Sequence, residues 1–318
     1  MNFHRFLKDW SLPIAMIGGV VIYFLYVNIP LFDSTHMLAN KVVSILQPAL
    51  IFAMLFVTFC KIKISDLRPS RWHFILLAFQ MLLFITFSLA VAYIKPLTLA
   101  ERVLLESFMI CLVCPTATAA AVITAKLGGN SASLISYTML INICVAIVAP
   151  FFLTLSNRVE GASFITSFLL IAGKVFPLLL CPLLAAEILR LLFPKIHKYF
   201  ISKGRNLPFY LWLVALALAI AMTTRAIVHT NLSLLVMAGI SVVSLICCVG
   251  QFIFGWWIGK KYGERVTGGQ ALGQKNTVFA IWLAYTFLTP VTAIAGGFYS
   301  LWHNSVNTWQ LYRQNHRK

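Results

Sequence analysis

The segment GGQALGQKNTVFAIW, residues 268–282, places glycine, amide and lysine side chains between two apolar stretches. Lys275 lies near the middle of this segment. A helix that faces lipid would not tolerate such a run, because the membrane interior penalises polar and charged side chains. If the chain spans a membrane, the segment therefore predicts a helix that is interrupted inside the protein, where other groups can satisfy its polar atoms.

The composition of the chain indicates a polytopic membrane protein. Of its 318 residues, 60% are hydrophobic and only 10% are charged, whereas soluble domains carry about 25% charged residues. A soluble domain of this size would have to cover its surface with polar groups. We therefore expect the lipid bilayer to cover much of the surface of this protein.

The net charge of the chain is +17, from 25 Lys and Arg residues against 8 Asp and Glu residues. Such a balance is also found in nucleic-acid-binding proteins. Here, however, the basic residues form short clusters between apolar runs of about 20 residues, which is the pattern of membrane loops. We therefore expect no nucleic-acid partner.

Ten hydrophobic spans can be counted, and all should be helical because lipid offers no hydrogen-bond partner to an open strand. The expected spans lie near residues 12–31, 39–60, 72–94, 100–125, 131–155, 163–192, 207–227, 232–258, 268–288 and 291–311. Most Lys and Arg residues fall at the two ends of the chain and in alternate loops. This bias predicts an all-α, multi-pass protein of the inner (plasma) membrane with both termini cytoplasmic.

Ten spans divide into an N-terminal five-helix repeat, residues 1–158, and a C-terminal repeat, residues 159–318, that would enter the membrane from opposite sides. Spans four and nine then occupy corresponding places. Span four contains CPTATAAAV, residues 114–122, in which Pro115 removes a backbone donor. Two discontinuous helices in matching positions indicate a binding site near the membrane midplane. The alternative is a pair of ordinary kinks packed against their neighbours.

Four motifs, in spans four, nine and ten and just before span three, are similar to those of a known family. CPTATAAAV (114–122) matches a CPGGTASNV-like motif, ALGQKNTVFA (271–280) an EVGMQNSGLA-like motif, and YSLWHN (299–304) an FSVWHN-like motif. LRPSRW (67–72), followed by Gln80, also fits. In these features the chain resembles the bile acid:sodium symporter family, especially its bacterial members. The resemblance implies a core domain that contains the crossed spans four and nine, a panel domain that moves against it, and an amphipathic organic anion as substrate.

The resemblance also locates two sodium sites, and the chain departs from the family in both. Where the family has a Ser-Asn pair in span four, this chain has Ala120-Ala121. In span nine, Ala271 stands in place of the glutamate of the family, and Lys275 in place of the glutamine four residues later. Sodium needs oxygen ligands that alanine side chains lack, and an ammonium repels a nearby cation. The potential ligands that remain are Gln80, Thr138, Gln274 and Asn276. We therefore expect no metal or other cofactor, and no sodium coupling of the usual kind.

We hypothesise that the Lys275 ammonium occupies the place of the missing ion and donates to backbone carbonyls and helix C-terminal ends there. If it stays protonated, the protein is a sodium-independent carrier or exchanger. If it gives up its proton inside the membrane, it can release that proton during the transport cycle. The alternative is a lysine that snorkels to the cytoplasmic surface.

Other polar residues complete the candidate site. Thr118 accompanies Pro115 in span four, and His303 and Asn304 belong to span ten. We expect His303 to hold span ten against span nine through a hydrogen bond, although a histidine there could also titrate. Lys174, inside span six, either faces the cavity and attracts an anionic substrate or snorkels to the surface.

Two acidic residues lie within the predicted spans. Glu106 falls in span four and Glu187 near the end of span six, and either could pair with a lysine. Glu187 and Arg190 are three residues apart on one helix face and could instead neutralise each other.

The leading interpretation is a secondary transporter of an organic anion, a bile acid or another carboxylate. A sodium-coupled symporter that uses the remaining oxygen ligands is the first alternative, and a membrane anion sensor that transports nothing is the second. We do not expect an enzyme, because the sequence contains no GxSxG or HExxH motif and no span pairs carboxylates or histidines at metal-ligand spacing.

Overall fold

The protein is built from helices. The computed structural model describes residues 11–61, 68–157, 161–203 and 207–316, and within these ranges no β-strand is present. Six of the helices in these described ranges are long and apolar enough to cross a membrane. They are α3 (His36–Phe59), α4 (Arg71–Tyr93), α7 (Ser131–Ser156), α8 (Phe164–Leu192), α10 (Leu207–Val228) and α11 (Leu234–Lys261). The chain is therefore an all-α protein with the character of a multi-pass membrane protein.

The remaining helices are shorter or more polar. They are α2 (Ser11–Asn28), the 3-10 helix η1 (Pro30–Thr35), α5 (Leu99–Val113), α6 (Ala120–Lys126), α9 (Pro194–Lys203), α12 (Arg265–Gly273), α13 (Thr277–Phe287) and α14 (Pro290–Asn315). The expected spans near 100–125 and 268–288 are each divided into two helices, as their proline, glycine and amide residues predicted. The helix α9 was not expected, because its basic residues were assigned to a loop.

Capping side chains explain where several helices begin. Thr98 and Glu101 cap α5 reciprocally, since the Thr98 backbone N–H donates to the Glu101 carboxylate over 2.8 Å and the Thr98 hydroxyl accepts from the Glu101 N–H. Asn130 accepts from the Ser133 N–H at the start of α7. Asn276 accepts from the Phe279 N–H at the start of α13. The second helix of the interrupted span nine thus begins at a residue that can satisfy its free N–H groups.

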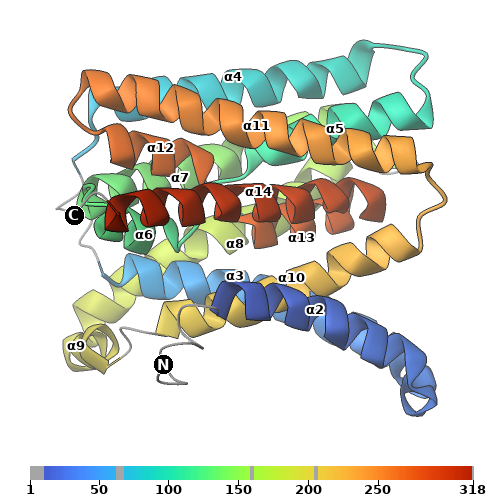
Figure 1. Ribbon diagram of the computed structural model, residues 1–318, viewed down its shortest axis with the longest axis horizontal. Helices are drawn as coiled ribbons and strands as arrows, with labels where there is room; N and C mark the ends of the chain where they lie inside the picture. The colour runs from blue at the N-terminus through green and yellow to red at the C-terminus, as the bar shows by residue number, and fades with distance from the viewer. Residues whose placement is uncertain (1–10, 62–67, 158–160, 204–206, 317–318) are drawn as a thin grey trace.

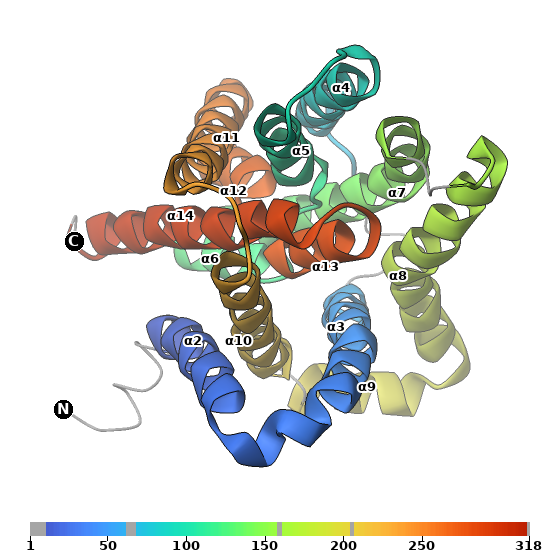
Figure 2. The ribbon, with the colours of Figure 1, turned by 90° about the vertical axis from the view of Figure 1, so that its right-hand side faces the viewer.

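The helices form two groups, which Figure 2 shows from the end of the bundle. The helices α2, α3, α8 and α10 lie on one side, joined by contacts of α10 with α2 and α3 and of α3 with α8. The interrupted helices lie in the other group, with α4, α7, α11 and α14 packed around them. The turns after α6 and α11 and the end of α14 lie at the same end of the bundle, on the left of Figure 1. Lys126 at the end of α6, Lys261 at the end of α11 and Arg313 near the end of α14 therefore lie toward one end of the bundle.

The interrupted helix pair α12 and α13 is buried along most of its length. Every residue from 267 to 284 is buried. The glycines of α12 permit close packing against α11: a Cβ on Gly268 would lie 2.4 Å from the carbonyl oxygen of Gly255, and one on Gly273 would lie 2.3 Å from the ring of Phe252. These glycines are therefore required by a close approach of two helices.

Candidate functional site

The two helix breaks meet, and their backbones pair. The first break, residues 114–119, separates α5 from α6, and the second, residues 274–276, separates α12 from α13. Thr116 and Lys275 form an antiparallel bridge. The Asn276 N–H donates to the Pro115 carbonyl, and the Ala117 N–H donates to the Gln274 carbonyl, each over 2.9 Å. Each break thus satisfies backbone groups that the other leaves free. We call residues 114–119 and 274–276 the crossing.

Side chains fasten the crossing to the neighbouring turns. The Thr116 hydroxyl donates to the Ala271 carbonyl over 2.6 Å. The Tyr299 hydroxyl, from α14, donates to the Gly273 carbonyl over 2.9 Å. Both acceptors lie in the last turn of α12, where carbonyl groups have no partner within the helix. The end of α12 is therefore held from two sides.

Lys275 is the buried cation of the crossing, with an exposed fraction of 1%. Its ammonium donates to the side-chain oxygen Oε1 of Gln80 over 2.7 Å. The described residues hold no carboxylate in an ion pair with it. A lysine that snorkels to the surface would expose its ammonium, so that interpretation is wrong.

Gln80 connects Lys275 to the end of α5. Its amide nitrogen Nε2 donates to the carbonyls of Leu112 and Cys114, each over 2.8 Å. The Tyr137 hydroxyl donates to Oε1 over 3.3 Å. The amide nitrogen must face the two carbonyls, because an oxygen there would have nothing to accept, so Oε1 faces the ammonium. We expected Lys275 to donate to backbone carbonyls itself; it reaches the C-terminal end of α5 through Gln80 instead.

The alanines that replace the expected sodium ligands lie in and beside the crossing. Ala120 is the first residue of α6, and both it and Ala271 are fully buried. Ala121, the next residue, is partly buried and accepts from the Ser131 hydroxyl through its carbonyl. None of the three brings a side-chain oxygen to the place that Lys275 occupies.

The remaining candidate ligands have varied surroundings. Gln274 is buried, and its Oε1 has no partner among the described residues. Asn276 is also buried, and its Nδ2 likewise lacks a partner there. The Thr138 hydroxyl donates to the Leu134 carbonyl of its own helix over 2.9 Å. Thr118 is buried in the first break. Of the four ligands that the sequence retains, Gln80 alone bonds to the Lys275 side chain.

The histidine expected to join spans ten and nine does not do so. His303 is buried against the Tyr299 ring, and its Nδ1 has no partner within the described ranges. Asn304 donates to the Ser300 carbonyl of its own helix. The helices α14 and α12 are joined instead by Tyr299 and by Asn307, which accepts from the Gln270 side chain over 3.0 Å.

Three residues of the site escaped the sequence interpretation. Tyr137, Gln251 and Tyr299 donate to the groups around the crossing. The side chain of Gln251, on α11, donates to the Cys111 carbonyl over 3.3 Å and to the Tyr299 hydroxyl over 3.1 Å. An amide inside an apolar helix was the one available signal, since Gln251 interrupts the run SLICCVGQFIFGWW of residues 244–257.

The two acids of the predicted spans pair with arginines of their own helices. Glu106 is buried, with Arg102 3.0 Å away and the Thr292 hydroxyl 2.7 Å away. Glu187 pairs with Arg190, as their spacing predicted. Among the described residues, neither acid pairs with a lysine. Lys174 is exposed and lies over the Phe287 ring, 5.7 Å from its centre.

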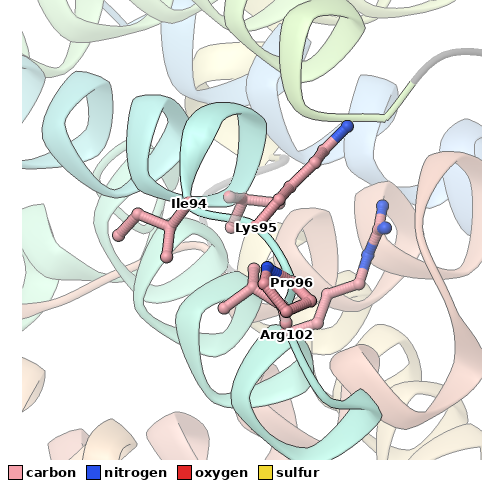
Figure 3. Close-up of a pocket in the computed structure, with 6 residues that line it drawn as sticks. Ile94, Lys95, Pro96 and Arg102 are labelled. Carbon is pink, nitrogen blue, oxygen red and sulfur yellow. The ribbon is translucent and has the colours of Figure 1, made fainter.

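A surface cavity of about 480 Å³ lies away from the crossing, at the connection between α4 and α5. Its lining includes Lys95, Pro96 and Arg102, and Figure 3 shows both basic side chains extending away from the connecting segment. It contains none of the candidate site residues. The crossing therefore remains the candidate site.

Comparison with known proteins adds no family: no family model matches the chain, and no curated protein sequence matches it.

Proposed function

We propose that this protein is a secondary transporter of an organic anion, a bile acid or another carboxylate, that works by alternating access without sodium. The observation that carries the proposal is the crossing: two interrupted helices pair through their backbones around a buried ammonium. Interrupted helices that meet inside a membrane protein typically form the binding site of a transporter. The motif resemblance to the bile acid:sodium symporter family supports the substrate class.

The same proposal includes the finer architecture. The six membrane-length helices, together with α2, α14 and the two interrupted pairs, would make ten spans. Residues 1–158 and 159–318 would form the two inverted repeats, and each would supply one interrupted helix. The group that holds the crossing would be the core domain, and α2, α3, α8 and α10 the panel. The excess of basic residues would place both termini in the cytoplasm.

Lys275 is proposed to serve as a tethered cation. A mobile sodium ion about 4 Å from its ammonium would be repelled by about 4 kcal/mol at an effective dielectric constant near 20. Gln80, a retained candidate ligand, already accepts a hydrogen bond from that ammonium. The crossing would thus carry its own cation, with no sodium ion to bind or release.

Counterflow tests the proposal. Liposomes that contain the purified protein and unlabelled bile acid should take up labelled bile acid in sodium-free buffer, and a sodium gradient should not increase the uptake. Lys275→Met should abolish uptake, because the crossing loses its charge. Lys126→Met, which removes an exposed lysine, should leave uptake unchanged.

The alternatives predict different results. Uptake that requires sodium would support the sodium-coupled symporter and contradict the tethered cation. Thermal stabilisation by bile acids without counterflow would support a sensor. Small carboxylates should be tested beside bile acids, because the proposed substrate class includes both.

A further inference from the structure

Buried polar side chains continue from the crossing toward the end of the bundle that holds the α6–α7 and α11–α12 turns. They are Gln270 on α12 and Gln274 just after it, one turn apart, and His303 and Asn307 on α14, which Gln310 follows one turn further along. The bonds of Tyr299 to Gly273 and of Asn307 to Gln270 hold these two helix faces beside each other. The row passes from fully buried residues to the partly exposed Gln310 and Gln314.

Six side-chain atoms in this region are buried and have no hydrogen-bond partner within the described residues. They are Thr124 Oγ1, Gln270 Oε1, Gln274 Oε1, His303 Nδ1, Asn307 Nδ2 and Gln310 Nε2. A buried polar atom without a partner costs about 1–3 kcal/mol. Six such atoms in one row are therefore expected to have a partner that is not part of the protein chain.

The chemistry of these atoms identifies that partner. Of the six atoms, two amide nitrogens can only donate and two amide oxygens can only accept. The Thr124 hydroxyl can do both, and the His303 ring nitrogen does one or the other according to its tautomer. A cation would require acceptors throughout and an anion would require donors. The oxygen and nitrogen of a side-chain amide change places when the amide is turned over. Even if the amides of Gln270, Asn307 and Gln310 are all turned over together, the row still contains both donors and acceptors. Water is the ligand that both donates and accepts at every site.

The row opens at a surface cavity. A hollow of about 370 Å³ is lined by the α6–α7 and α11–α12 turns and includes Asn130, Glu264 and Thr267. Thr124 lies directly beside Thr267: a Cβ on Gly129 would lie 2.7 Å from the methyl carbon of Thr124 and 3.1 Å from the Thr267 hydroxyl. The unpartnered Thr124 hydroxyl is therefore close to this opening.

We propose that a file of bound water runs from this cavity, between α12, α14 and α6, to the crossing at Gln274 and Lys275. A proton that leaves the ammonium would pass to the water and leave a neutral amine, and its return would restore the ammonium. The file itself follows from the geometry, whereas its use for proton exchange rests on the proposed function.

Silver ions test the file, because Ag⁺ is small, travels through water and binds thiols. Inside-out vesicles carrying Asn307→Cys, Thr124→Cys or Ile294→Cys would be exposed to Ag⁺. The protein would then be unfolded, and every thiol that had not bound Ag⁺ would be alkylated. Mass spectrometry would measure the alkylation of each cysteine separately, so the native cysteines would not interfere. Ile294 is the control, because it lies on α14 and is fully buried in apolar surroundings.

Cysteine at 307 and 124 should react at least about tenfold faster than cysteine at 294, since a dry site requires local opening. Equal rates at all three positions, in inside-out and in right-side-out vesicles, would overturn the proposal. This result depends neither on transport nor on the proposed orientation of the termini, so failure of the file and failure of the proposed function can be told apart.

Radiolysis of the unaltered protein provides a second test that requires no variant. Hydroxyl radicals formed from bound water oxidise the nearest side chains. His303 should therefore be oxidised while Met109, which is intrinsically reactive but fully buried in the apolar core, should not. Oxidation of Met109 with His303 intact would contradict the file.

Discussion

The two helix breaks meet in one place but contribute different chemistry. The first break, residues 114–119, has six residues and supplies backbone groups, such as the Pro115 carbonyl and the Ala117 N–H. The second, residues 274–276, has three residues and supplies the Lys275 charge. One break thus provides a neutral backbone frame and the other the cation. Gln80 joins them, because it bonds to the end of α5 and to the ammonium.

The largest expected effect comes from removing that connection. Gln80→Leu would leave the Lys275 ammonium buried without its bond, and an unsatisfied buried group costs about 1–3 kcal/mol, or more when it is charged, so we expect a cost of at least about 3 kcal/mol here. We expect the free energy of unfolding in detergent to fall by this amount. The measurement is unfolding by denaturant, followed by tryptophan fluorescence.

The control for this variant is Gln80→Leu combined with Lys275→Met. If the loss arises from the stranded charge, the double variant should recover most of the stability. A double variant as unstable as Gln80→Leu alone would show that Gln80 matters to the two α5 carbonyls and not to the cation.

An intermediate effect is expected where the second break is held against α11. Gly268→Ala would place a methyl group 2.4 Å from the Gly255 carbonyl, and overpacking of this kind costs about 1–3 kcal/mol. The melting temperature should therefore fall. Gly250→Ala in α11 is the control, since a Cβ there meets nothing within 4 Å. Equal melting temperatures for the two variants would contradict the close approach of α11 and α12.

The smallest effect is expected from one side-chain bond of the first break. Thr116→Val keeps the shape of the side chain but removes the hydroxyl that donates to Ala271, which should cost about 1 kcal/mol. Thr118→Val, two residues away, removes a hydroxyl for which no side-chain hydrogen bond is present in the described part of the chain, and should change stability less. The melting temperatures of the two variants provide the comparison. A larger loss from Thr118→Val would place the main side-chain bond of this break at Thr118.

Much of the fold could be predicted because lipid restricts the chain to few solutions. The observed helix ends lie within a few residues of the expected spans, since apolar runs and polar turns alternate clearly. Both breaks were expected from Pro115 and from the glycine and amide residues around Lys275. The helix α9 was missed because a short amphipathic helix and a basic loop have the same composition.

The candidate site was predicted less completely. Its central residues, Lys275 and Gln80, could be named from their types and positions. The expected bond of His303 to span nine was wrong, because helical periodicity does not say which side chain of a polar face reaches the neighbouring helix. Tyr299 and Asn307, on the same helix, make those bonds.

The sequence by itself determined that the chain is helical, that it has the character of a membrane protein and that two helices are interrupted, because these properties depend on local composition and on the cost of polar groups in a membrane. Only the tertiary structure decided what surrounds the charge. The ammonium of Lys275 bonds to Gln80, 195 positions away in the sequence, and the two breaks satisfy each other through backbone atoms common to all residues. Contacts of this kind depend on three-dimensional packing, so they become visible only when the helices are assembled.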